Sequence, residues 1–190
     1  MKFVEVKNPK DFFEHEMDNL RFSVASFFTF VKDDGEYLNK QLYKIGRFPI
    51  FNEEKNIGIV KKVIEERYPQ DIIDMGKEDY KKNGIKHYEW HLIEPDTLVD
   101  LNTGKELYVV NNQDFDHLSL WENLIVETCH NDNTKVINFD GTIIWEGNTS
   151  YSNIFMTNDY LVIKLNHNYQ TNTDDLIMID KFTGEIKFKY

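Results

Sequence analysis

The sequence predicts a mainly β protein of the α+β class, with antiparallel sheets in the C-terminal half and an N-terminal part that contains two helices and a hairpin. Apolar residues recur at helical spacing only in residues 1–84, whereas short strands separated by turn residues fill residues 85–190. In the second part, one phrase occurs three times: an apolar strand, an aspartate, a glycine turn and another strand. Its turn glycines are Gly104, Gly141 and Gly184. We expect the two parts to form one compact unit together.

The N-terminal part begins with a strand at residues 3–6. Asn8 is placed to cap a following helix, with Pro9 in its first turn, and this helix should end near residues 19–21. Period-two alternation of apolar residues then predicts a strand over residues 22–30. Asp34-Gly35 is typical of a hairpin turn and should lead into a partner strand.

A second amphipathic helix is predicted from Glu53 to Tyr68. Its apolar residues recur at helical spacing, Asn52 could cap it, and Pro69 would end it. The polar segment from 71 to 83 is expected to be a short helix or a loop at the boundary between the two parts.

After this boundary the helical period disappears. Turn residues separate the predicted strands, which cover residues 85–93, 97–101, 106–110, 117–121, 123–130, 135–140, 142–146, 152–157, 160–166, 176–180 and 185–190. The last two four-stranded units align strand for strand, and residues 85–110 form a partial unit.

The repeated phrase resembles the blade hairpin of quinoprotein-type and WD-repeat β-propellers, most clearly in residues 100–105 and 180–185. The turn glycines are 37 and 43 residues apart, and a blade repeats at about 40 residues. Because a closed propeller has at least about four blades, this chain would form an open set of sheets, capped by the N-terminal helices or completed by another chain. The resemblance implies a binding scaffold, and we expect no cofactor.

The net charge of −11 is unevenly distributed. Residues 1–84 carry 15 basic and 16 acidic side chains, whereas residues 85–190 carry 7 and 17. Residues 94–146 alone contain eleven carboxylates and only two lysines, Lys105 and Lys135. Such a field repels phosphate backbones and attracts a basic protein, so we expect a protein partner and no direct nucleic-acid binding. Alternatively, the acidic side chains serve only solubility.

One local cluster suggests a metal site. On the strand predicted over residues 85–93, alternation places His87, Glu89 and His91 on one face, and imidazole and carboxylate groups suit zinc or ferrous iron. Residues two apart on a strand lie roughly 6 to 7 Å apart, so binding by all three needs a bend or another ligand. The alternative is a polar sheet face opposite buried Tyr88 and Trp90.

Aromatic residues within an acidic rim are typical of a protein-binding surface. The candidate partner-binding residues are Trp121, Glu122, Glu127, Asp132, Trp145, Glu146 and Tyr151. Core packing is the alternative for the aromatic residues. The single cysteine, Cys129, excludes an intramolecular disulfide and is expected to be structural.

No phosphate-binding loop, nucleophile elbow or metal-spaced cysteine set occurs in the sequence. The sequence therefore favours a non-enzymatic, acidic, bacterial-type protein-binding module. The physical profile fits an immunity or antitoxin-type protein, or a phage-type inhibitor, that blocks a basic toxin or nuclease. A metal-binding protein or enzyme and a structural fragment of a larger propeller assembly are the alternatives. We expect a cytoplasmic protein, because the N-terminus lacks a signal-peptide pattern and no stretch has the roughly 20 apolar residues of a membrane span.

Overall fold

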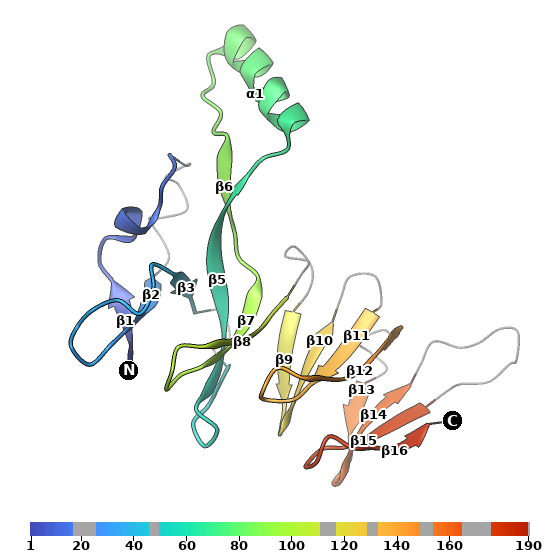
Figure 1. Cartoon of the computed structure of the whole chain (residues 1–190). Coiled ribbons are helices and arrows are strands. Elements are labelled where there is room, and N and C mark those ends of the chain that lie inside the picture. Colours follow the sequence, from blue (N-terminus) through green and yellow to red (C-terminus); the bar gives the residue numbers. More distant parts are fainter. Residues whose placement is uncertain are drawn as a thin grey trace, which may run out of the picture. The chain divides into compact units, whose positions relative to one another are not determined.

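The computed structural model describes residues 1–16, 26–45, 50–110, 117–128, 133–148, 154–164 and 176–189. The chain divides into two compact units (Figure 1). The first consists of Met1–Phe48 with Val60–Glu94, and the second of Pro49–Ile59 with Pro95–Tyr190. The second unit therefore combines a short segment of the N-terminal half with most of the repeat region.

Strands account for most of the regular structure in the described ranges. The elements are β1 (Lys2–Val6), the 3-10 helix η1 (Pro9–Phe12), β2 (Phe27–Val31), β3 (Leu42–Lys44), β4 (Ile50–Asn52), β5 (Ile57–Arg67), α1 (Gln70–Asn83), β6 (Trp90–Ile93), β7 (Asp96–Asp100), β8 (Glu106–Val109), β9 (His117–Trp121), β10 (Leu124–Thr128), β11 (Asn133–Ile137), β12 (Ile143–Asn148), β13 (Ile154–Met156), β14 (Tyr160–Lys164), β15 (Leu176–Asp180) and β16 (Ile186–Lys189). The mainly β prediction is confirmed.

The first unit is built on antiparallel pairing in the order β1-β2-β3-β5, with β6 paired to the later part of β5. Its core contains four buried side chains, one from each of β2, β3, β5 and β6: Phe27, Leu42, Val63 and Leu92. These side chains bring distant strands together because burying each of them removes apolar surface from water.

The first predicted helix is wrong within the described residues. Only η1 forms there, and Phe13 at its end is already extended. The Asn8 side chain binds the Asp11 carboxylate instead of capping the backbone. The backbone N–H groups of Glu14 and His15 donate to the carboxylate of Glu65, so they are not available for helical hydrogen bonds. Residues 17–25 lie outside the described part of the chain.

The second predicted helix is also wrong, because its residues form the eleven-residue strand β5. Strand partners lie on both sides: Leu42 of β3 is paired with Val63, and Ile93 of β6 is paired with Ile64. Asn52, the predicted helix cap, instead accepts the backbone N–H of Lys55 in the turn between β4 and β5. Tertiary pairing outweighs the helical spacing of the apolar residues.

The α-helix of the first unit is α1, in the segment expected to be a short helix or a loop. It begins after Pro69 and ends at Gly84, whose left-handed φ of 69° suits glycine at a helix C-terminus. Its buried residues are Ile73 and Gly76. At 14 residues α1 is too short to span a bilayer, and no other helix in the described ranges meets the length and hydropathy of a membrane span.

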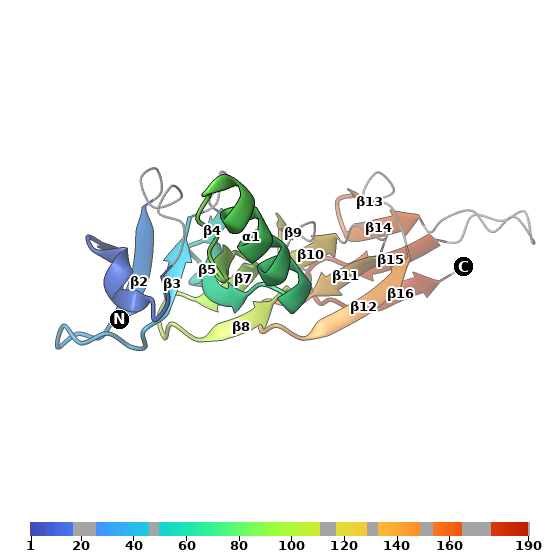
Figure 2. The ribbon, with the colours of Figure 1, turned by 90° about the horizontal axis from the view of Figure 1, so that it is seen from above.

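The second unit contains two four-stranded antiparallel sheets, ordered β12-β11-β10-β9 and β13-β14-β15-β16, and the hairpin β7–β8. These correspond to the two complete repeat units and the partial one that the sequence predicts. β4 also belongs to this unit and is paired with the first residues of β5. Figure 2 shows the two four-stranded sheets in succession along the chain.

Two cores join the sheets of the second unit. One lies between the β9–β12 sheet and the β13–β16 sheet, and includes Val136 and Ile179. The other joins β7 and β8 to the opposite face of the β9–β12 sheet, and includes Leu98 and Ile137. The β9–β12 sheet is therefore covered on both faces, which explains the apolar run of residues 124–126 in its central strand β10.

Candidate interaction surface on the repeated sheets

Each of the three repeated aspartates accepts a backbone hydrogen bond from its own turn. Asp100 Oδ1 accepts the backbone N–H of Asn102 at 2.8 Å. Asp140 Oδ1 accepts that of Thr142 at 2.9 Å, and Asp180 Oδ1 accepts that of Phe182 at 2.9 Å. Backbone hydrogen bonds hold the pKa of the Asp140 and Asp180 carboxyls below the usual range. These two carboxylates therefore remain negative at neutral pH.

The repeated glycines place each turn against the preceding repeat. Gly141 and Gly184 have φ of +89° and +73°, in the left-handed region. A Cβ on Gly141 would lie 2.1 Å from the carbonyl oxygen of Leu107, and one on Gly184 would lie 2.8 Å from Cδ1 of Ile144. Both contacts fall three residues after the preceding turn glycine, so successive repeats pack in the same way.

Glu127, a predicted partner-binding residue, is fully buried and bound inside the second unit. Its Oε2 lies 3.0 Å from Nζ of Lys135 and accepts the hydroxyl of Tyr108. Burial and the hydrogen bond to Glu127 raise the pKa of Tyr108 to about 12. Burial lowers the pKa of Lys135, but its hydrogen bonds to Glu127 and Tyr108 outweigh this and raise it overall. The three side chains connect β8 with β10 and β11.

Trp121 and Trp145 pack mainly into the core between the two four-stranded sheets. Trp145 is 9% exposed and belongs to that core, and Trp121 is half-buried against it. The indole N–H of Trp121 donates to Oγ of Ser119 at 2.9 Å. This placement agrees with the alternative interpretation, in which the aromatic residues pack in the core instead of binding a partner. It leaves little aromatic surface at these two positions.

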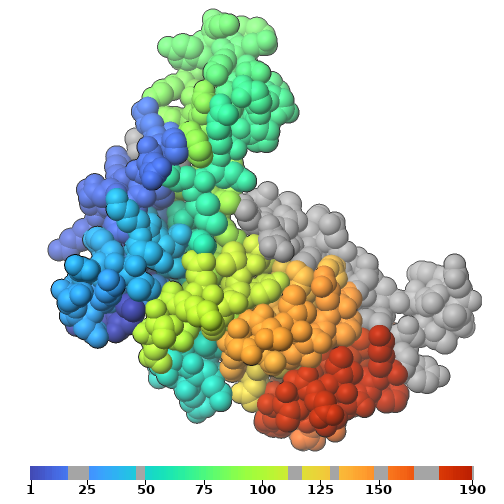
Figure 3. Space-filling view, in the orientation of Figure 1, coloured from blue at the N-terminus to red at the C-terminus, as the bar shows by residue number. Residues whose placement is uncertain are grey.

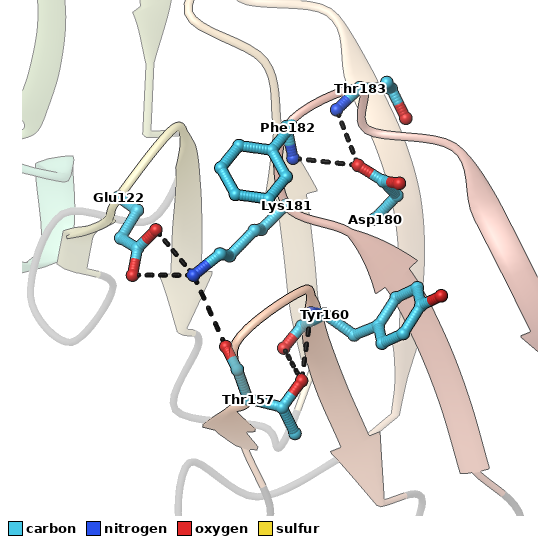
Figure 4. Close-up of polar contacts among 7 residues, drawn as sticks. All are labelled: Glu122, Thr157, Tyr160, Asp180, Lys181, Phe182 and Thr183. Atoms are coloured by element: carbon cyan, nitrogen blue, oxygen red, sulfur yellow. Dashed lines mark hydrogen bonds and ion pairs between the residues drawn. The ribbon is translucent and has the colours of Figure 1, made fainter.

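Glu122 lies at the surface, at the turn between β9 and β10. Its side chain is 52% exposed and its two oxygens lie 2.9 and 2.8 Å from Nζ of Lys181 (Figure 4). Nζ of Lys181 also donates to the carbonyl oxygen of Thr157 at 3.4 Å. The β13–β16 sheet is thereby tied to the β9–β12 sheet. The sequence gives no sign of this role for Lys181, because its partner is 59 residues away.

Of the other predicted partner-binding residues, Glu146 is exposed on β12 and accepts a hydrogen bond from the Asn133 side chain at 2.8 Å. Asp132 and Tyr151 lie outside the described residues, as does Cys129. The acidic surface that the structure describes on the β9–β12 repeat thus includes Glu122, Asp140 and Glu146.

The candidate metal ligands lie in the first unit but do not converge. The strand starts at Trp90 rather than residue 85, because β5 ends just before Pro69 and leaves nothing for residues 85–88 to pair with. Glu89 binds Arg67 and Lys77, both at 3.1 Å. His91 stacks on Tyr68 with ring centroids 4.0 Å apart, and His87 packs against Gly76. Among the described residues, no group of three such side chains is arranged to hold a metal ion.

These three residues instead line a groove of about 920 Å³ in the first unit. One wall is α1, which contributes Ile72 and Tyr80, and the other is the segment 85–92. The groove combines aromatic rings with the ammonium groups of Lys77 and Lys86. Sequence reasoning missed it, because the helix that forms one wall was expected to be a boundary segment.

No protein-family model and no curated protein matches this sequence. Among solved structures, BamB from Moraxella catarrhalis matches with a TM-score of 0.36 and 7% identity, over 100% of this chain and 50% of that chain. Quinohemoprotein alcohol dehydrogenase from Comamonas testosteroni matches with a TM-score of 0.29 and 12% identity, over 51% of this chain and 18% of that chain. The chain thus spans about half the length of the first protein.

Structural similarity at these TM-scores does not indicate an activity for this chain. The propeller resemblance is confirmed only at the level of antiparallel, blade-like sheets, because the described strands of the second unit do not close into a ring.

Proposed function

We propose that this chain is a non-enzymatic protein-binding module that uses its acidic repeats to bind and block a basic partner protein. An immunity or antitoxin-type protein, or a phage-type inhibitor, fits this description. The partner class would be a basic toxin or nuclease.

The proposal rests on one observation: within residues 94–146, carboxylate side chains far outnumber lysines. One of the two lysines in this stretch, Lys135, is used internally to neutralise buried Glu127. At the surface, Asp140 stays ionised because its turn stabilises the charged form, and Glu146 is exposed on the neighbouring strand. A surface of this sign accelerates encounter with a basic protein and repels other acidic surfaces.

The partner is sought by pull-down from the native host and by coexpression with the product of the neighbouring gene. We expect a stoichiometric complex with a basic protein that dissociates when salt is raised to about 0.5 M, because screening shortens the range of the field. Recovery of the chain without a partner in both experiments would contradict the proposal.

Charge variants then test the surface itself. Glu146→Lys combined with Asp140→Asn removes two negative charges and adds one positive charge, and Asn keeps an acceptor oxygen for the turn. Association with the basic partner should slow roughly tenfold at low salt. Glu36→Lys combined with Asp79→Asn makes the same charge change at exposed positions of the first unit and is the control. If both double variants slow association equally, the partner responds to the net charge of the whole chain and not to the acidic surface of the repeats.

A further inference from the structure

The groove between α1 and residues 85–92 plays no part in the proposed function. Both of its walls come from one continuous stretch of the first unit, residues 68–92, all of which the structure describes. The walls meet at Gly76, where a Cβ would lie 2.9 Å from Cβ of His87. Figure 3 shows α1 and the segment that follows it, both in green, side by side at the surface.

Apolar side chains along this groove are exposed to water. Ile72 is 45% exposed, and Tyr80 and Ile85 are each 57% exposed. These residues extend from the first turn of α1 to the residue after Gly84, at the end of the helix. Exposed apolar side chains that gather in one groove, rather than being scattered singly, are typical of a binding site.

The charge that lines the groove is mainly positive. At neutral pH its charged side chains are three lysines and one glutamate: Lys77, Lys81, Lys86 and Glu89. The four acidic side chains of α1 do not line it: Asp71, Asp74, Glu78 and Asp79. This contrasts with the net charge of −11 for the whole chain. The groove therefore attracts a negatively charged group, unlike the acidic repeats.

Lys81 is the lysine best placed to bind such a group. Lys77 pairs with Glu89 at 3.1 Å, and Lys86 pairs with Glu16 at 2.8 Å. Lys81 makes no ion pair with any residue in the described part of the chain. A carboxylate from a ligand can thus bind Lys81 without displacing an internal partner.

The wall opposite α1 offers backbone hydrogen-bonding groups. β6 pairs with β5 only from Trp90 onward, and residues 85–88 make no backbone hydrogen bond to the backbone of another described residue. An extended peptide can pair with a segment of this kind, as in recognition by strand addition. The 14 residues of α1 make it roughly 21 Å long, which an extended peptide spans with about six residues.

We propose that this groove binds an extended, acidic segment of a partner protein that also carries apolar side chains. The inference is independent of the proposed function, because it concerns the first unit and a ligand of the opposite charge. Ile72 and Ile85 favour a peptide over single-stranded nucleic acid, since aliphatic side chains give a base no ring on which to stack.

Fluorescence anisotropy with a labelled peptide tests the proposal. The probe is a peptide of about eight residues in which glutamate alternates with leucine, slightly longer than the groove. The full chain should bind it with a Kd on the order of 50 μM, as expected for a small, reversible contact. The same peptide with glutamine in place of glutamate should bind about tenfold more weakly, because it lacks the charge that the lysines attract.

Two neighbouring lysines give a matched pair of variants. Lys81→Glu should weaken binding of the glutamate peptide about tenfold or more. Lys82→Glu makes the same charge change in the same turn of α1, at a position that does not line the groove, and should weaken binding about twofold at most. Circular dichroism spectra establish that each variant is folded. If either variant fails to fold, Lys81→Gln and Lys82→Gln take the place of the pair.

Hydrogen exchange locates the bound peptide. A saturating concentration of the glutamate peptide should slow exchange in residues 70–83 and leave exchange in β2 unchanged. The proposal is overturned if the glutamate peptide does not bind at about 1 mM, twenty times the expected Kd. It is also overturned if the glutamine peptide binds equally well, if the Lys81 and Lys82 variants lose equal affinity, or if a labelled oligothymidylate binds more tightly than the peptide.

Discussion

At the scale of single residues, the turn glycines control how one repeat packs on another. Gly141 and Gly184 both require a left-handed backbone, but their surroundings differ. The atom that a side chain would meet at Gly141 belongs to the backbone of Leu107, whereas at Gly184 the nearest atom is the tip of the Ile144 side chain. A backbone cannot move aside as a methyl group can.

We therefore expect Gly141→Ala to lower the free energy of unfolding by about 3 kcal/mol or more, through backbone strain and overlap together. Gly184→Ala should cost less, because Ile144 can shift. Gly35→Ala should cost only about 1 kcal/mol, because Gly35 has a φ of +91° and no atom within 4 Å of the added Cβ. Urea denaturation of the three variants measures the ranking, and equal costs would show that the overlap at Leu107 relaxes freely.

The buried Glu127–Lys135 pair yields a second prediction at this scale. Lys135→Met should destabilise the protein by about 3 to 5 kcal/mol, because it leaves the Glu127 carboxylate buried without a counter-ion. Adding Glu127→Gln should restore most of the stability, because the charge is then gone and the amide can still accept the Tyr108 hydroxyl. Denaturation monitored by tryptophan fluorescence measures both variants. No recovery in the double variant would mean that the pair itself is strongly stabilising.

At the scale of elements, α1 is attached to the rest of the first unit through very little apolar surface. Its buried residues are Ile73 and Gly76, while Ile72, Met75 and Tyr80 are exposed. A helix of 14 residues has little stability of its own and depends on packing. We infer that α1 unfolds locally at a lower free energy than the sheet beside it.

Ile73→Ala should therefore release α1 without unfolding the sheet. Hydrogen exchange of residues 70–83 should accelerate roughly 30-fold, corresponding to about 2 kcal/mol for the lost side chain, while exchange in β2 and β3 stays unchanged. Ile72→Ala, at a neighbouring exposed position, is the matched control and should change little. Acceleration throughout the first unit would show that α1 and the sheet unfold together.

Whether a segment forms a strand or a helix could be predicted where the residues that determine it are close together in the chain. The hairpins after Leu98 form within a few residues of the positions expected from their turns, because an aspartate and a glycine at fixed spacing determine the turn by themselves. β5 was not predictable from its spacing. Ile57, Val60, Val63 and Ile64 satisfy a helical period, but these β-branched residues also suit a strand, and partner strands distant in sequence are available to pair with them.

At the scale of the whole molecule, the candidate surface divides into a part predicted by sequence and a part that was not. Acidity follows directly from composition, and Glu122 and Glu146 are exposed as a partner-binding role requires. Glu127 and Trp145 are buried, because burial depends on which face of a strand meets the next sheet.

The sequence by itself determined the repeat, its turns, the strands around them and the location of the negative charge. All of these depend on residues that are close together in the chain. The tertiary structure decided that residues 57–67 are a strand, that His87, Glu89 and His91 do not converge, and that Glu127 and Trp145 are buried. Each of these outcomes depends on pairing or packing between distant segments, whose free energy outweighs the local preference of any one of them.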